Sequence, residues 1–211
     1  MLEPLGDRVA ELLPEEAACV ARAVDKRRRE FAAGRVLARR LLAELGCPPG
    51  PLLPAPDRVP RWPDGIVGSL AHSTEHVVVA VARAGAGAGA GGGGLRALGV
   101  DLERRAPLDE ELWGVVLRPE ERRHVEALPA AERGEHALLV FCVKEAAYKA
   151  QYPLSGEVLE FAEVAAEVDP AAGRFTARLP DRVQAAVGAE VVAGVLHRGP
   201  TTVLAGVSLR G

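Results

Sequence analysis

The sequence predicts a mixed α and β protein whose elements run in the order helix, strands, helix, strands. Apolar residues recur at helical spacing over residues 14–45 and 108–150. Valine-rich segments near residue 80 and alternating apolar residues after Pro153 are typical of strands. The order of elements gives an impression of two similar halves, although no clear residue-level repeat accompanies it.

The first helical region begins at Pro14, because a proline followed by two glutamates suits the first turn of a helix. It ends at Gly46 and the prolines that follow. We expect two helices or one broken helix over about 14–45. Gly34 is the expected break, because glycine costs about 1 kcal/mol relative to alanine inside a helix.

A proline-rich segment over residues 46–64 predicts an extended loop, and 66–70 and 76–81 predict short strands. Val77-Val78-Val79 is nearly continuous and β-branched, so we expect it to be buried on both faces. The alanine and glycine run 84–94 has nothing that can pack, which favours a plain connector between two paired strands. A phosphate-binding glycine loop is the weaker interpretation, because no lysine or helix start follows the run.

The second half predicts helices first and strands later. Pro119 and two glutamates mark one helix start, and a second helix is expected to end near Ala150. The expected strands are 158–168, 174–179, 191–196 and 202–209, joined in pairs by turns.

Composition and charge exclude several classes of protein. The chain is 48% hydrophobic and 26% charged over 211 residues, which indicates a globular protein of one large domain or two small ones. A net charge of −3 argues against broad nucleic-acid binding, and no apolar run reaches the roughly 18 residues of a membrane span. Cys19, Cys47 and Cys142 form neither a disulfide framework nor a zinc spacing. We therefore expect a cytoplasmic protein that binds neither nucleic acid nor membrane.

Two carboxylates near the end of an expected strand are candidate metal ligands. Asp101 and Glu103 lie two positions apart, so on a strand both side chains project to the same side. Binding of a cation between them relieves their repulsion, and hard oxygen ligands suit magnesium. The alternative, which the pair alone favours, is a solvated strand edge leading into the loop 104–107.

Further candidate groups lie on the expected helices and beside a strand. Glu145 and Lys149 share a helix face and could act as metal ligand or base and as phosphate-binding cation, or form an ordinary pair worth about 0.2–0.5 kcal/mol. His72 could donate to a phosphate oxygen, or be structural. Arginine suits a phosphate dianion, and a solvated helix face is the alternative for the basic run Lys26 to Arg29 with Arg35, Arg39 and Arg40.

In combination and order these features resemble the 4′-phosphopantetheinyl transferase superfamily. Gly-Val-Asp-Leu-Glu at 99–103 and Phe-Cys-Val-Lys-Glu-Ala-Ala-Tyr-Lys at 141–149 look like its paired signatures, at the spacing of the monomeric type with two halves. Residues 26–39 and 61–73 look like the enterobactin-synthetase-component-D subgroup. The resemblance covers about residues 20–155.

The resemblance implies an α+β fold of two similar α/β halves, related by a pseudo-two-fold axis within one monomer. The N-terminal half, 1–95, would bind the 3′-phosphate of coenzyme A through its helix region and end in the linker 84–94. The C-terminal half, 96–211, would carry the magnesium site and the catalytic helix. The implied enzyme moves phosphopantetheine from coenzyme A to a serine of an acyl or peptidyl carrier protein and releases 3′,5′-ADP. The implied pathways are secondary-metabolite, siderophore, fatty-acid or polyketide biosynthesis.

The resemblance also implies roles for single residues. Asp101, Glu103 and Glu145 would hold Mg²⁺ on the pyrophosphate, and Glu145 and Lys149 would be catalytic. The family usually has a basic residue just before the Trp-Pro-Asp-Gly stretch, where this chain has Asp57 with Arg58 beside it. The residues implied to contact coenzyme A are Arg27, Arg35, Arg58, His72, Lys144 and Lys149.

A carrier protein is usually acidic around its serine, so it needs a basic or apolar receiving surface. Val115-Val116-Leu117 with Arg118, Arg122 and Arg123 is the candidate, because it lies between the two signatures; burial of these apolar residues in the core is the alternative. Three other functions stay open. They are a non-catalytic coenzyme A-binding protein of the same fold, a basic-helix nucleic-acid binder using 26–40, and a magnesium-dependent phosphoesterase.

Overall fold

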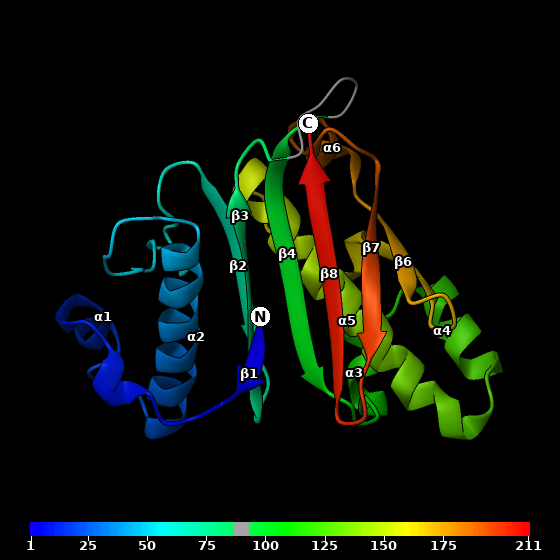
Figure 1. The fold of residues 1–211 in the computed structure, drawn as a ribbon. Helices are drawn as coiled ribbons and strands as arrows, with labels where there is room; N and C mark the ends of the chain where they lie inside the picture. The colour runs from blue at the N-terminus through cyan, green and yellow to red at the C-terminus, as the bar shows by residue number, and fades with distance from the viewer. Residues whose placement is uncertain (87–92) are drawn as a thin grey trace.

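The computed structural model describes residues 1–86 and 93–211, which form two halves, each with a long helix packed on an antiparallel sheet (Figure 1). The first sheet has the strand order β1 (Leu2–Pro4), β3 (His76–Arg83), β2 (Ile66–His72), and α2 (Asp25–Glu44) packs on it. The second sheet has the order β4 (Leu95–Arg104), β8 (Thr202–Arg210), β7 (Val191–Arg198), β6 (Arg174–Arg178), β5 (Ala165–Asp169), and α5 (Ala130–Ser155) packs on it. The predicted α+β class is confirmed.

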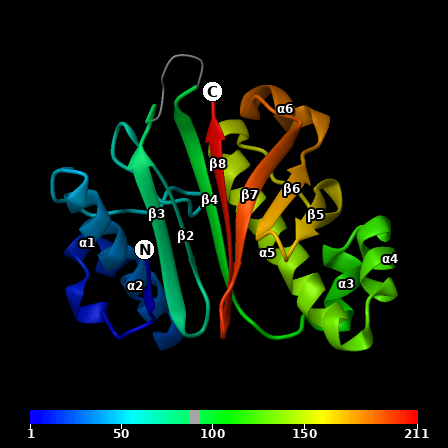
Figure 2. The same cartoon turned by 45° about the vertical axis from the view of Figure 1, so that its right-hand side comes forward.

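The shorter helices lie at the outer sides of the two sheets (Figures 1 and 2). They are α1 (Pro14–Cys19), α3 (Glu110–Val116), α4 (Pro119–Ala127), α6 (Asp181–Val187) and the 3-10 turns η1 (Val9–Glu11) and η2 (Phe161–Glu163). The sequence did not indicate β1 or α6, and the expected strand 158–168 is instead η2 followed by β5. Within the described residues, no helix combines the length and apolar character that crossing a membrane requires.

The expected break of the first helical region at Gly34 is wrong. The helix α2 runs through Gly34 without interruption, and the chain turns instead between Val20 and Val24, whose backbone is extended. Gly34 is buried, and a Cβ added there would meet Leu70 only at 3.7 Å. Packing of this helix face against the sheet therefore outweighs the low helix propensity of glycine.

The valine run of β3 is buried on both faces, as predicted. Val77 and Val79 pack with Leu37 and other residues of α2. Val78 points the other way and packs with Leu102 of β4. The first sheet is thus held between its own helix and the edge of the second sheet.

The expectation that the glycine-rich run joins two paired strands is wrong. β3 pairs with β1 and β2, whereas β4 pairs with β8. Residues 87–92, the middle of the run, lie outside the described part of the chain. A side chain adds a link between β2 and β4, because the backbone N–H of Val100 donates to Ser69 Oγ at 3.0 Å.

One glycine sets the distance between β4 and α5. A Cβ added at Gly99 would lie 2.0 Å from the backbone oxygen of Ala146 and 2.7 Å from the backbone nitrogen of Ala150. Only glycine permits so close an approach of two main chains. The helix continues past its expected end near Ala150 to Ser155, and Gly156 closes it in the left-handed conformation with φ 69°. The close approach brings the acidic end of β4 beside the middle of α5.

Candidate functional site

A cavity of about 300 Å³ lies where α2 and β2 of the first half face β4 and α5 of the second. An adjoining hollow of about 460 Å³ shares Arg27, Arg35, Leu70 and Lys149 with it. Seven of the sequence-predicted residues line the first cavity: Arg27, Arg35, His72, Asp101, Glu103, Glu145 and Lys149. Residues far apart in the sequence are therefore brought to one place, with the two halves supplying opposite walls.

The second half contributes three acids and one lysine. Strand alternation puts Asp101 and Glu103 on the cavity side of β4, and one helical turn separates Glu145 from Lys149 on α5. Lys149 Nζ donates to Asp101 Oδ1 at 2.6 Å and lies 3.8 Å from Glu145 Oε2. One ammonium group thus bridges Asp101 of the strand and Glu145 of the helix.

These charges perturb one another because the site is partly withdrawn from water. Burial, reinforced by the charge of Asp101, raises the pKa of Glu103 to about 7. Burial also raises the pKa of Glu145, against the attraction of Lys149. Burial opposes charge on Lys149, but the carboxylates of Asp101 and Glu145 outweigh it and raise the pKa of the ammonium group. The site has more negative charge than a single lysine neutralises.

The acidic residues fit a hard divalent cation. Asp101 Oδ2 is buried and has no hydrogen-bond partner among the described residues, so one oxygen is left to accept a ligand. Carboxylate oxygens are the ligands that Mg²⁺ prefers, and Asp101, Glu103 and Glu145 supply them. Within residues 1–86 and 93–211, no group of three acid, histidine or cysteine side chains is already closed around a metal position.

The first half supplies a basic wall around a glutamate that sequence reasoning missed. Arg27 Nη1 lies 3.3 Å from His72 Nε2. Glu30 Oε2 lies 3.7 Å from Arg27 and 3.6 Å from His72, and Glu30 is largely buried. Burial lowers the pKa of His72, against the pull of Glu30, so the imidazole is mostly neutral at pH 7. Glu30 lies three residues after Arg27 on the expected helix, and this spacing was the feature of the sequence that could have predicted their pairing.

Arg35 is the most deeply buried arginine of this wall. Its guanidinium lies 4.2 Å from the ring centre of Phe31, and its Nε donates to the backbone oxygen of Leu52 at 2.7 Å. Burial lowers the pKa of Arg35 to about 10, so the group is still charged at neutral pH. A guanidinium fixed by Nε presents its remaining donors to the cavity as a preformed fork.

Arg58 lines the adjoining hollow but not the acidic cavity. It ends a turn in which its backbone N–H donates to Ala55 oxygen at 2.8 Å, and its φ of 72° is left-handed. The neighbouring Asp57 accepts a hydrogen bond from Tyr152 Oη at 3.1 Å. This contact joins the long loop of the first half to the end of α5.

The structure does not bring Lys144 to the cavity. Its side chain is 1% exposed, and its Nζ donates to Val116 oxygen at 2.8 Å, Glu121 Oε2 at 2.7 Å and Phe161 oxygen at 2.9 Å. All three N–H donors of the ammonium are therefore used. Lys144 instead lines a separate hollow of about 210 Å³ that shares Glu145 with the acidic cavity.

The predicted carrier surface is only partly a surface. Val116 and Leu117 are buried in the core, as the alternative interpretation held, whereas Val115 is 61% exposed. The neighbouring arginines are engaged in ion pairs or close contacts with Glu120 and Glu126: Arg118, Arg122 and Arg123.

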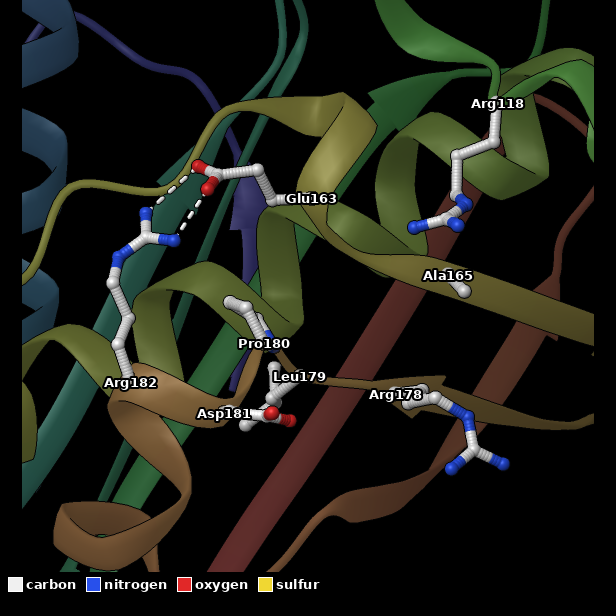
Figure 3. A pocket seen from close by; sticks show the side chains of 8 residues that line it. All are labelled: Arg118, Glu163, Ala165, Arg178, Leu179, Pro180, Asp181 and Arg182. Atoms are coloured by element: carbon white, nitrogen blue, oxygen red, sulfur yellow. Dashed lines mark hydrogen bonds and ion pairs between the residues drawn. The ribbon is translucent and has the colours of Figure 1, made fainter.

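A further hollow of about 510 Å³ lies between η2 and the start of α6 (Figure 3). Three arginines line it, but Arg182 forms a two-pronged pair with Glu163, as Figure 3 shows. Arg178 pairs with Glu190, and Arg118 donates to Ala162 oxygen at 3.1 Å. The arginines of this hollow therefore already have partners.

Comparison with known proteins gives consistent matches. Residues 15–82 match the family model "4'-phosphopantetheinyl transferase N-terminal domain", and residues 97–198 match the model "4'-phosphopantetheinyl transferase superfamily". The chain is 48% identical to 4'-phosphopantetheinyl transferase Svp of Streptomyces mobaraensis, over 82% of this chain and 68% of that protein. It is 39% identical to PptT of Mycobacterium tuberculosis, over 79% of this chain and 71% of that protein. A solved structure titled "Chronobacterium ammoiniagenes apo-ACPS structure" overlaps 54% of this chain and 96% of that chain, with 27% identity and a TM-score of 0.40, too low to carry an argument.

Proposed function

This chain belongs to the 4′-phosphopantetheinyl transferase superfamily and is an enzyme of that kind, and we propose that the cavity between its halves is the active site. The reaction moves the phosphopantetheine arm of coenzyme A to a serine hydroxyl of a carrier protein and releases 3′,5′-ADP. The observation that carries the proposal is the contact of Lys149 with Asp101 and Glu145 opposite a basic wall. Cations and acids meet there, as binding of a pyrophosphate and a metal requires.

The basic wall would hold the phosphate groups of coenzyme A. Arg27 and Arg35 line both the acidic cavity and the adjoining hollow, so a phosphate between them is within reach of two guanidinium groups. Neutral His72 would donate one further hydrogen bond. The adjoining hollow, lined by Trp62 and reached by Arg58, would take the 3′-phosphoadenosine end.

The pantetheine arm would then leave on the far side of Glu145. The hollow of about 210 Å³ there is lined by Tyr148, Leu159 and Phe161. The arm has both methylene groups and amides, and the hollow offers both apolar side chains and the polar groups of Lys144 and Glu160. Since Glu145 lines both this hollow and the acidic cavity, the phosphate under attack would lie beside it.

Members of the family use coenzyme A and typically a divalent metal, and for this chain we propose Mg²⁺ held by Asp101, Glu103 and Glu145. The bound cation would neutralise the pyrophosphate and stabilise the departing 3′,5′-ADP. The raised pKa of Glu103 and the unpartnered Oδ2 of Asp101 support this choice. A bound cation would stabilise the ionised form of Glu103 and would give Asp101 Oδ2 a partner.

Two residues of α5 would act on the reacting groups themselves. Glu145 would accept the proton of the attacking serine, directly or through a bridging water, because a metal-bound carboxylate is by itself a weak base. Lys149, whose ammonium is only partly exposed, would stabilise the charge that develops on the transferred phosphate. Arg27 and Arg35 would hold the substrate in place meanwhile.

The cognate partner is proposed to be an acyl or peptidyl carrier protein, received in part by exposed Val115 and the arginines of α4. We further propose a cytoplasmic monomer, consistent with the three free cysteines. The halves 1–95 and 96–211 are proposed as its structural units, and the enterobactin-synthetase-component-D subgroup as its nearest type. The pathways proposed are secondary-metabolite, siderophore, fatty-acid or polyketide biosynthesis.

Intact-protein mass spectrometry of a carrier domain tests the proposal. The purified protein is incubated with coenzyme A, MgCl₂ and an apo carrier domain, with chelator in a matched sample. The expected result is a mass gain of one phosphopantetheine that the chelator abolishes. Measurable coenzyme A binding with no gain on any of several carriers would instead favour the non-catalytic binder.

A further inference from the structure

A buried carboxylate lies outside the cavity and has no part in the proposed chemistry. Glu16 of α1 is 0% exposed. Its Oε2 accepts hydrogen bonds from the backbone N–H of Leu13 at 3.1 Å and from the guanidinium of Arg39. Its Oε1 accepts a hydrogen bond from the backbone N–H of Leu52 at 2.9 Å. An ionised group so deeply buried is kept only with such partners.

The main chain of Leu52 connects this carboxylate to the basic wall. The N–H of Leu52 donates to Glu16 Oε1, and the carbonyl oxygen of Leu52 accepts the 2.7 Å hydrogen bond from Arg35 Nε. A continuous line of hydrogen bonds therefore runs from Arg39 through Glu16 and Leu52 to Arg35. Glu16 reaches the substrate-facing arginine without touching the cavity.

No backbone–backbone hydrogen bond of the described loop holds the N–H or the carbonyl oxygen of Leu52. Leu52 lies in the loop 46–64, where backbone hydrogen bonds join Leu53 to Arg61 and Ala55 to Val59 beside the bridge of Pro54 with Pro60. The buried Leu52 side chain, packed with Leu37, anchors the residue but leaves rotation of its peptide groups to be set by hydrogen bonds. Glu16 supplies the bond to the N–H.

From this arrangement we infer that Glu16 is a positioning residue, which sets the Arg35 guanidinium for the 3′-phosphate of coenzyme A through the main chain of Leu52. The inference rests on the proposed role of Arg35. Loss of the carboxylate frees the Leu52 N–H to seek another acceptor, which turns the carbonyl that holds Arg35 Nε. The guanidinium then meets the phosphate without its preset orientation, and charge-assisted hydrogen bonds depend strongly on geometry.

Isothermal titration calorimetry with coenzyme A and with 3′-dephospho-coenzyme A separates this role from a general structural one. Glu16→Ala is expected to weaken coenzyme A binding about tenfold and dephospho-coenzyme A binding less than about twofold. Glu16→Gln has an amide oxygen that can still accept the hydrogen bond from the Leu52 N–H. This variant is expected to keep most of the preference for coenzyme A over 3′-dephospho-coenzyme A. Glu3→Ala is the control, because Glu3 also pairs with an arginine of α2, Arg40, but on a side away from Leu52.

The outcomes separate the inference from the proposed function. Arg35→Ala should abolish the preference for coenzyme A over its dephospho form; an intact preference there overturns both the phosphate clamp and the inference. If Arg35→Ala abolishes the preference but Glu16→Ala weakens both ligands equally, or neither, the inference alone is overturned. Glu16→Asp keeps the charge for Arg39 but shortens the reach to Leu52. It carries the same test, with a smaller expected loss, if Glu16→Ala does not fold.

Discussion

The two faces of α5 use the same kind of residue for opposite purposes. Lys144 and Lys149 are five positions apart, about 140° around the helix. Lys144 donates three hydrogen bonds in the interior, whereas Lys149 donates one, to Asp101, at the edge of a cavity. Lys144, whose donors are all satisfied, cross-links the fold, whereas Lys149 lies among acids at the cavity where we propose that the substrate binds.

The largest expected effect tests the cavity face. Glu145→Gln removes the proposed base and one metal ligand but keeps the volume, so we expect turnover to fall by about 10²–10⁴ with little change in coenzyme A affinity. Carrier modification followed over time by mass spectrometry gives the rate, and calorimetry gives the affinity. Unchanged turnover would remove Glu145 from the mechanism.

The next effect tests the buried face. Lys144→Met leaves Glu121 buried without its cation, and breaking a buried pair costs about 3–5 kcal/mol of unfolding free energy. Lys149→Met is the matched variant on the other face. Compared with Lys144→Met, it should lower the free energy of unfolding much less and the turnover far more. Urea unfolding and the carrier assay are run on both. A Lys144→Met protein of normal stability without activity would show that Lys144 acts on the substrate, as the resemblance implied.

A third prediction concerns what holds the two elements of the site together. In Gly99→Ala the new methyl would meet Ala146 oxygen at 2.0 Å, so β4 and α5 must separate. Overpacking of this kind costs about 1–3 kcal/mol, and turnover should fall as well because Asp101 moves away from Lys149. Gly114→Ala on α3 is the control, since nothing lies within 4 Å of its added Cβ. Equal melting temperatures for both variants would contradict the close approach.

The smallest expected effect is a pH-dependent gain. The pKa of Glu103 is about 7 in the folded chain against an ordinary 4.5, so the folded state binds more protons than the unfolded state between these values. Ionisation of Glu103 therefore lowers the free energy of unfolding progressively as pH rises from 4.5 to 7, and this destabilisation reaches its full size above pH 7. In chelator, Glu103→Gln should raise the melting temperature at pH 8 more than at pH 5.5. A gain of the same size at both pH values would contradict this.

Local spacing was enough to predict which residues of the second half line the cavity. Asp101 with Glu103 follows from strand alternation and Glu145 with Lys149 from helical periodicity, and the known order of these motifs joined the pairs. The positions of Lys144 and Glu16 could not be found in this way. Their partners are distant in sequence, at Val116 and Phe161 for Lys144 and at Leu52 for Glu16, and only tertiary packing decides such contacts.

The fold was predictable to the same degree and for the same reason. The long helices and the strands that flank them have long apolar segments that are visible in the sequence, whereas short elements such as β1 and α6 depend on their neighbours. Gly34 shows the competing effect directly, because burial against a sheet overrides the propensity that suggested a break there.

The hydrogen bond between Val100 and Ser69 marks the seam where the first sheet meets the second. Arg27, Arg35, His72 and Glu30 of the cavity come from one side of that seam, and Asp101, Glu103, Glu145 and Lys149 come from the other. Neither side alone holds a complete set of groups. The site therefore behaves as a subunit interface that happens to lie within one polypeptide, and separately expressed halves would report, through restored catalysis, on anything that brings them together.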